Sequence, residues 1–301
     1  MASIHPFRAL RPAPGTAPSV SSVPYDVVTT EEARGLAAGN PLSFLRITRS
    51  EIDLPVSTDP YSAQVYARAR ANFDALKTQA PLVIEDRPSL YFYRLRMGEH
   101  EQTGIAGTFS VDEYEADVIK KHERTRRDKE DDRTRHIIEL RAQTGVVFLT
   151  YKSSAGVDAI AQRVTAGDAL YDFTADDGVH HAVWRASDAE AMELVAEFAK
   201  IPALYIADGH HRAASAARAR AELKGQPDAA ASNSFIAVAF PDDQVQILPY
   251  HRTVKDLAGR APEQFLEDLR RVAPVAGGSA TPGHQGEVSM YLAGRWYVID
   301  L

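Results

Sequence analysis

The chain contains no cysteine among its 301 residues. It therefore cannot form disulfides, bind a metal through thiolates or use a cysteine nucleophile, and it lacks the usual signature of an oxidising compartment. Long apolar runs are also missing, because the first residues include no signal-peptide core and no stretch approaches the ~18 apolar residues of a membrane helix. We therefore expect a cytoplasmic protein with no membrane partner.

Two common nucleotide-binding signatures are absent as well. The sequence has neither a G-x-x-x-x-G-K-[ST] loop, which excludes a P-loop enzyme, nor the glycine-rich loop of protein kinases. The formal net charge of -7 and the lack of a recognisable helix-turn-helix argue against a nucleic-acid partner.

The pattern of apolar residues predicts a mixed α/β protein of the α+β class. The chain is 45% apolar and 25% charged, so it can bury a sizeable core. Helical spacing is expected over 60–78 and 189–200, and the latter segment begins with a capping box of Ser187 and Glu190. Short strand-like runs are expected before, between and after these helices, over 42–48, 90–96, 103–111, 145–151, 204–208, 235–240 and from 245 onward.

We divide this pattern into two lobes. Residues 1–155 form an N-terminal mixed α/β lobe, and residues 156–301 form a second lobe. Because strands are expected on both sides of residue 155, the two lobes could interleave in one sheet.

The most informative segment is the turn Asp208-Gly209-His210-His211-Arg212. An apolar run ends at this turn, and an alanine-rich helical pattern follows it directly. The first N–H groups of a helix lack intrahelical partners and lie at the positive end of the dipole, so they bind anions. Gly209 allows close backbone approach, and the other four residues supply donors, charge and one carboxylate. The pattern favours phosphate chemistry. The alternative is an ordinary helix start in which Asp208 is only a cap.

A second unusual segment, residues 119–135, carries eight Lys/Arg and five Asp/Glu. Dense mixed charge is often only a solvated helix or loop. This segment, however, follows a β-rich region, where loops at strand ends commonly carry ligand-binding groups. We therefore expect His122 and Glu123 to lie within reach of the Asp208–Arg212 turn, with Glu123 orienting or deprotonating an acceptor. The residues that could help to clamp phosphates are Lys121, Arg124, Thr125 and Arg133.

His251 and Arg252 follow the strand expected from Val245 onward. If that strand pairs beside the central one, both side chains would join the site. The alternative is that the pair only decorates the surface.

Several motifs occur together along the chain and carry a resemblance. They are Pro6-Phe7-Arg8, Pro24-Tyr25-Asp26-Val27, Asn40-Pro41-Leu42-Ser43-Phe44-Leu45-Arg46, Thr103-Gly104, His122-Glu123-Arg124-Thr125 with Asp132-Arg133, Ala207-Asp208-Gly209-His210-His211-Arg212, and Leu248-Pro249-Tyr250-His251-Arg252. On these residues the chain resembles the DUF1015 family. Its Asp-Gly-His-x-Arg turn is also similar to that of ParB/sulfiredoxin-fold free serine kinases, in which the turn binds a nucleotide or pyrophosphate. The resemblance implies a ParB/sulfiredoxin-like core with an additional N-terminal mixed lobe.

The resemblance also implies a phosphotransferase that uses ATP, ADP or pyrophosphate and phosphorylates a small hydroxyl compound, with free serine as the leading acceptor. Asp208, Glu123 and His122 would be catalytic, and Asp208 or Glu123 could hold Mg²⁺ through oxygen ligands. Gly209, His210, His211 and Arg212 would bind the phosphates. The substrate residues would be Tyr25, Asp26, His251 and Arg252.

Two other classes of function remain open on the sequence. One is a nucleotide-binding, ParB-like switch or binding protein. The other is a metal-dependent hydrolase whose ligands would be His122, Glu123, His210 and His211, a set suited to zinc or manganese.

Overall fold

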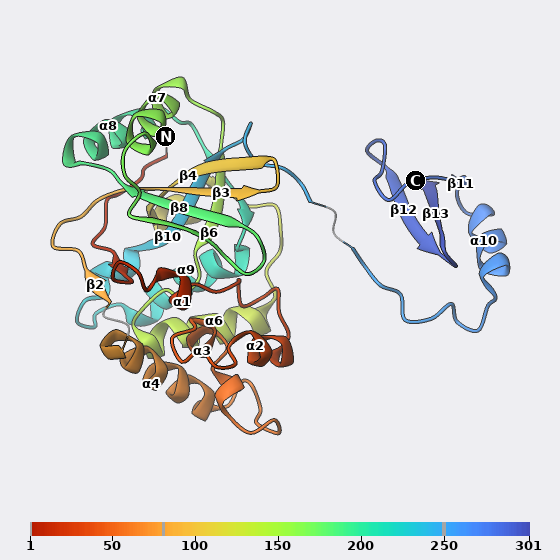
Figure 1. Cartoon of the computed structure of the whole chain (residues 1–301), viewed down its shortest axis with the longest axis horizontal. Helices are drawn as coiled ribbons and strands as arrows, with labels where there is room; N and C mark the ends of the chain where they lie inside the picture. Colours follow the sequence, from red (N-terminus) through yellow and green to blue (C-terminus); the bar gives the residue numbers. More distant parts are fainter. Residues whose placement is uncertain (1, 80–81, 249–250) are drawn as a thin grey trace. The chain divides into compact units, whose positions relative to one another are not determined.

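The computed structural model describes residues 2–79, 82–248 and 251–301 (Figure 1). The chain divides into two compact units, residues 1–245 and 246–301. Both units contain helices and strands, so the predicted α+β class is confirmed. Among the described residues, no helix has the length and apolar character needed to cross a membrane.

An eight-stranded sheet forms the centre of the first unit. In spatial order its strands are β5 (Ile119–Lys120), β9 (Leu204–Asp208), β6 (Val147–Tyr151), β10 (Ser234–Pro241), β4 (His100–Ser110), β3 (Tyr91–Met97), β8 (His180–Arg185) and β7 (Tyr171–Thr174). β5 is parallel to β9 and β6 is parallel to β10, whereas the other neighbours are antiparallel.

The strand order shows that the chain does not divide into separate lobes at residue 155. β6 precedes that residue, yet it lies between β9 and β10, which both follow it. Backbone hydrogen bonds therefore join strands from the two sides of residue 155 into one sheet. The structure divides the chain after Val245 instead.

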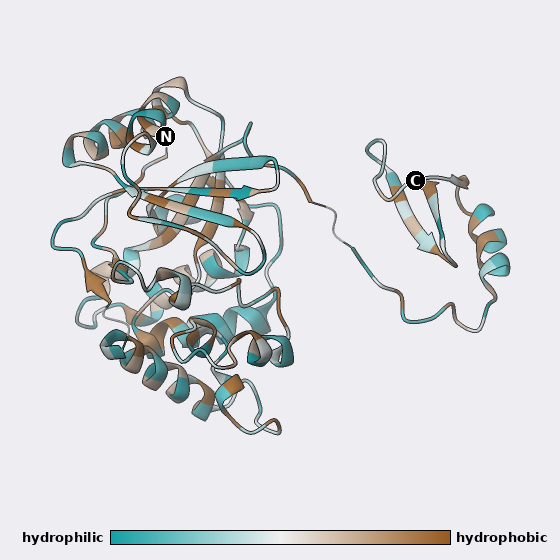
Figure 2. Ribbon diagram, in the orientation of Figure 1, coloured by the Kyte–Doolittle hydropathy of each residue, from teal (hydrophilic) through white to brown (hydrophobic). Residues whose placement is uncertain are grey.

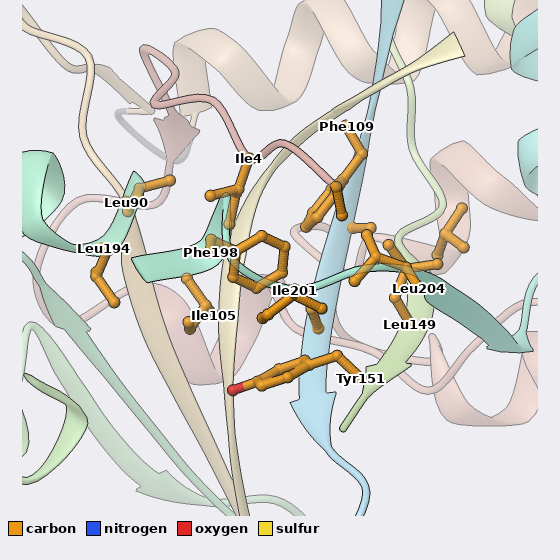
Figure 3. Packing of buried hydrophobic residues seen from close by; sticks show 14 of the residues in the cluster. Ile4, Leu90, Ile105, Phe109, Leu149, Tyr151, Leu194, Phe198, Ile201 and Leu204 are labelled. Carbon is orange, nitrogen blue, oxygen red and sulfur yellow. The ribbon is translucent and has the colours of Figure 1, made fainter. Parts of the chain in front are cut away.

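The main core lies against one face of this sheet. Helices α7 (Ala155–Thr165) and α8 (Asp188–Phe198) pack there, and α8 begins with the predicted capping box. The buried Phe198 ring meets Phe109 and Tyr151 edge-on, with ring centroids 6.0 and 5.4 Å apart. Figure 3 shows this ring among the side chains of Ile4, Ile105 and Ile201, and Figure 2 shows the hydrophobic residues gathered along the inner strands.

A layer of helices forms two smaller apolar clusters. It contains α1 (Ala17–Val20), α2 (Thr30–Leu36), α3 (Leu45–Thr48), the 3-10 helix η1 (Ser50–Asp53), α4 (Ala63–Gln79) and α6 (Arg127–Leu140). The helical spacing predicted for α4 is confirmed, since its residues Val65, Ala69, Phe73 and Leu76 are buried.

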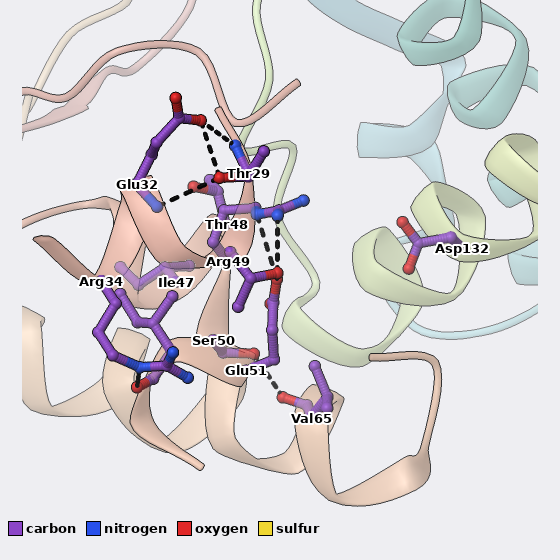
Figure 4. A network of polar contacts seen from close by, with 12 residues as sticks. Thr29, Glu32, Arg34, Ile47, Thr48, Arg49, Ser50, Glu51, Val65 and Asp132 are labelled. Carbon is purple, nitrogen blue, oxygen red and sulfur yellow. Dashed lines mark hydrogen bonds and ion pairs between the residues drawn. The ribbon is translucent and has the colours of Figure 1, made fainter. Parts of the chain in front are cut away.

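A polar network connects three helices of this layer, α2, η1 and α4 (Figure 4). The buried Glu51 carboxylate accepts a hydrogen bond from Thr30 at 3.2 Å and pairs with Arg49 at 3.1 Å. The neighbouring Ser50 hydroxyl donates to the Val65 carbonyl at 2.7 Å. Thr30 and Arg49 satisfy the buried carboxylate and tie α2 to η1, and the Ser50 hydrogen bond ties η1 to α4.

The predicted strand over residues 42–48 is wrong, because this segment turns into helix α3. The N–H groups of Thr48 and Arg49 donate to the carbonyls of Phe44 and Leu45 at 3.1 and 2.8 Å. A short apolar run does not distinguish a buried strand from a buried helical turn. Local hydrogen bonds decide the conformation here.

The predicted strand from Val245 onward is also wrong. The described residues 245–248 and 251–252 form no strand. The strand that precedes them, β10, is already paired with β4 on one edge and with β6 on the other. No open edge is left beside it for a further strand.

The remaining elements are short or belong to the second unit. In the first unit, β1 (Leu10–Arg11) pairs with β2 (Val83–Ile84), α5 (Val111–Glu115) follows β4, and the 3-10 helix η2 (Ala229–Asn233) precedes β10. The second unit contains α10 (Pro262–Arg270) and a sheet of order β11-β13-β12, which are Val275–Gly277, Arg295–Asp300 and Glu287–Leu292.

Gly104 of β4 provides a test of the packing between strands. A Cβ atom at this position would lie 2.9 Å from the Ala239 carbonyl oxygen and 2.7 Å from Val238 Cγ1. We expect Gly104→Ala to lower the free energy of unfolding by about 1–3 kcal/mol, because backbone and core must shift to admit the methyl group. Urea unfolding followed by circular dichroism measures this change.

Gly35→Ala is the matched control, because a Cβ at Gly35 in α2 meets nothing within 4 Å. It should leave stability unchanged or raise it by up to ~1 kcal/mol. Equal unfolding midpoints for Gly104→Ala and the natural protein would contradict the close approach of β4 and β10.

Candidate functional site

The predicted strand, turn and helix at Asp208–Arg212 are confirmed. β9 ends at Asp208, Gly209 has a φ of 92°, and helix α9 (His210–Leu223) begins at the next residue. This left-handed conformation favours glycine. No side chain among the described residues caps the first turn of α9. Its leading N–H groups are therefore left to water or a ligand.

The two segments expected to share a site do meet. The His122 backbone N–H donates to His210 Nε2 at 3.4 Å, across 88 residues of sequence. The two imidazole rings lie edge to face, with centroids 4.4 Å apart. Glu123 Oε2 lies 3.6 Å from His210 Nδ1. The prediction that His122 and Glu123 lie within reach of the turn is thus confirmed.

These contacts fix the form of the His210 ring. Because Nε2 accepts a backbone N–H, the ring proton lies on Nδ1, the nitrogen that faces Glu123. The His210 side chain is only 3% exposed, and its burial, followed by the charge of His122, lowers its pKa, against the opposing effects of Glu123 and Asp208. His210 is therefore a neutral ring that holds the 122–123 segment, and its Nε2 does not donate to a phosphate.

His211 makes a similar contact one residue later. Its Nε2 accepts the Arg126 backbone N–H at 3.0 Å. Farther along the same face of α9, Ser215 donates to the Glu130 carbonyl at 3.3 Å and Arg218 pairs with Asp131 at 2.5 Å. Residues four and seven positions apart share a helix face. This face of α9 therefore holds the start of α6 in place.

Most cations of the charged segment already have protein partners. Lys121 Nζ donates to the Tyr114 carbonyl at 2.6 Å. The neutral Thr125 also has a partner, since its hydroxyl donates to the Glu130 carboxylate. Arg133 pairs with Asp132 at 2.6 Å. Arg124, in contrast, is exposed and forms no ion pair or side-chain hydrogen bond with the part of the chain that the structure describes. Of the three cations predicted to clamp phosphates, Lys121, Arg124 and Arg133, Arg124 is therefore the one whose charge is not already paired within the described residues.

Arg212 is mostly buried and is engaged by three protein groups. Its side chain is 11% exposed, and its Nη1 donates to the Val146 carbonyl at 2.8 Å. Nη1 also lies 3.3 Å from Asp208 Oδ2, and Nη2 donates to Asp26 Oδ2 at 2.6 Å. Sequence reasoning did not identify Val146, and it could not, because a backbone carbonyl leaves no signature in the residue type.

Tyr25 and Asp26 also reach the turn. They lie in a segment before α2 that contains no helix or strand. The Tyr25 ring is contacted by two guanidinium groups, with its centroid 4.3 Å from Arg133 and 5.4 Å from Arg212. Their place in the site was predicted only through the resemblance carried by the Pro24-Tyr25-Asp26-Val27 motif. No spacing of residues in the sequence indicated it.

The other pair predicted to contact substrate, His251 and Arg252, lies in the second unit. Neither residue is in a strand, so the expected strand pairing that would carry them to the site does not occur. Residues 249–250 of the same motif lie outside the described residues.

The carboxylates near the turn fit a magnesium ion better than a ligand-rich metal centre. Within the described residues, no group of three His, Asp or Glu side chains is arranged to hold a metal ion. The Asp208 and Glu123 side chains are 65% and 56% exposed, and both act on the pKa of His210. Mg²⁺ usually takes only one or two carboxylates and completes its shell with water and substrate phosphates.

His136 of α6 gives a pH-dependent test of the packing beside the site. Its Nε2 donates to the Ile47 carbonyl at 3.0 Å, and burial, followed by the charge of Arg133, lowers its pKa from 6.5 to about 4. The unfolded chain therefore takes up a proton that the folded protein refuses between these pH values. We expect stability to fall as pH drops from 6.5 toward 4, with His136 accounting for about 3 kcal/mol.

The measurement is the urea midpoint as a function of pH for the natural protein and for His136→Gln. Glutamine keeps a side-chain N–H donor but does not titrate. The variant should show a shallower loss of stability over this range. Parallel curves for the two proteins would show that His136 does not carry the effect.

No curated protein and no solved structure matches the chain. The predicted likeness to the ParB/sulfiredoxin fold therefore stays a prediction. A family model, described as a protein of unknown function, matches residues 4–301. The chain belongs to the DUF1015 family.

Proposed function

We propose that the protein is a phosphotransferase that moves a phosphoryl group from a nucleotide or pyrophosphate to the hydroxyl of a small compound, with free serine as the first acceptor to test. One observation supports this most. The uncapped start of α9 lies beside two exposed carboxylates and the cationic segment that His210 and His211 hold in place. Phosphoryl transfer needs these parts together: donors for phosphate oxygens, cations and a carboxylate near the acceptor.

The donor phosphates would bind at the first turn of α9. The N–H groups there are free of side-chain caps, and Gly209 lets a ligand approach the backbone. Arg124 would add positive charge. Asp208 would hold Mg²⁺, which neutralises charge on the transferred group.

Glu123 would orient the acceptor and take its proton. Its carboxylate is exposed, yet the contact with the buried His210 ring fixes its position. The acceptor oxygen forms a bond to phosphorus, the bond to the leaving phosphate breaks, and the hydroxyl proton passes to Glu123. A positioned base of this kind contributes roughly 10²–10⁴-fold in rate.

The first experiment incubates the pure protein and Mg²⁺ with ATP, ADP or pyrophosphate, with and without free amino acids, and identifies phosphorylated products by mass spectrometry. A phosphorylated acceptor supports the proposal. Tight binding without turnover would favour a nucleotide-responsive binding protein, and phosphate release without an acceptor would favour a hydrolase.

Glu123→Gln tests the proposed base. We expect turnover to fall at least about 100-fold, because an amide cannot accept the proton. Donor affinity measured by calorimetry should change by less than about threefold, since Glu123 would not contact the phosphates directly. Glu222→Gln, an exposed glutamate near the far end of α9, is the control and should retain full turnover. Normal turnover in Glu123→Gln would remove Glu123 from the mechanism.

Arg124→Ala tests the proposed phosphate cation. Loss of a charge-assisted hydrogen bond of ~1.5–3 kcal/mol should weaken pyrophosphate binding about 10-fold or more. Arg127→Ala removes the same charge from an exposed residue at the start of α6 and should weaken binding much less. Equal losses in the two variants would indicate general electrostatic attraction and no specific contact.

A further inference from the structure

Arg212 carries one donor that the protein does not satisfy. Its Nη1 and Nη2 contact Val146, Asp208 and Asp26, but Nε is buried and has no hydrogen-bond partner among the described residues. Nε and Nη2 lie on one edge of the planar guanidinium. That edge can bind two oxygens of a single carboxylate or phosphate. Among the described residues, the carboxylate on this edge is that of Asp26, whose Oδ2 accepts a hydrogen bond from Nη2 at 2.6 Å.

Asp26, whose carboxylate contacts the Nε–Nη2 edge of Arg212, belongs to a segment with no regular structure. Residues 21–28 include no helix or strand, and the Asp26 side chain is 43% exposed. Tyr25 adds a second contact with the same guanidinium, at 5.4 Å from its ring centroid. Arg212 therefore bears two side-chain contacts of this segment. A change in the partner of Arg212 would alter how the segment is held.

The space beside Arg212 is too small for a larger ligand in this arrangement. The cavity lined by Tyr25, Arg133 and Arg212 has a volume of about 20 Å³. Such a cavity has room for about one water molecule. Because Asp26 already accepts from Nη2, a phosphate or a second carboxylate can bind both donors of the Nε–Nη2 edge only in place of Asp26.

We propose that the Nε–Nη2 edge of Arg212 is an oxyanion subsite that Asp26 occupies in the unliganded protein, and that a ligand oxyanion binds there by replacing Asp26. This inference rests on the proposed function, because the ligand would be the terminal phosphate of the donor or the carboxylate of the acceptor. Either group offers two oxygens and satisfies both donors of the edge. The exchange would also release the segment around Tyr25 and Asp26.

Asp26→Asn tests the exchange, because asparagine has the same shape but no charge to compete with the ligand. Calorimetric titrations of natural protein and variant use pyrophosphate in one arm and L-serine in the other. We expect at least about fivefold tighter binding by the variant in the arm whose oxyanion takes the subsite. Glu31→Gln removes an equal charge from the exposed face of α2 and should change neither affinity.

Backbone hydrogen exchange of residues 22–29 is the second readout. Without ligand, this segment should exchange faster in Asp26→Asn than in the natural protein, and saturating ligand should speed its exchange in the natural protein. Weaker or unchanged binding by Asp26→Asn, or an unchanged segment on ligand binding, would overturn the subsite while the proposed function stands. If neither protein binds pyrophosphate, ATP, ADP or L-serine, the proposed function and the subsite both fail.

Discussion

The left-handed turn at Gly209 is the constraint on which the arrangement of the site depends. It sends the chain from the end of β9 directly into α9, so that the first three side chains of the helix point to three different partners. His210 faces residues 122–123, His211 faces Arg126, and Arg212 returns beneath the turn to Val146. A Cβ at Gly209 would lie 3.3 Å from both the Val147 backbone and the Arg212 side chain. A larger residue would therefore strain the turn and crowd Arg212 at the same time.

Charge around the turn is largely balanced within the protein. Arg212 is shared by Asp26 and Asp208, Arg133 is held by Asp132, and Arg218 contacts Glu130 and Asp131. Pairs of this kind fix geometry more than they add stability, because burying the charges costs much of what their attraction returns. Outside these pairs lie the uncapped N–H groups of α9 and the exposed Arg124.

Sequence reasoning succeeded where one local rule decides the structure. The helical spacing of α4, the capping box of α8 and the strand-turn-helix at Gly209 all follow from neighbouring residues. It failed for α3, where a short apolar run fits two periods, and beyond β10, where the absence of an open edge depends on the whole strand order. In the site, the meeting of His122 with His210 could be expected from chemical complementarity. The roles of the three residues could not be predicted, because only the geometry shows them. His210 and His211 accept backbone N–H groups, and Arg212 donates to a backbone carbonyl.

The interleaved strand order has a consequence for how the chain folds during its synthesis. β4 and β6 are made early, but β10, which lies between them, is made only near the end of the first unit. Until β10 emerges, the facing edges of β4 and β6 have no partner, and unpaired edges of this kind promote association between chains. Pairing between strands so distant in sequence is also slow to form. The nascent first unit would therefore depend most on protection from aggregation in the interval before residues 234–241 leave the ribosome.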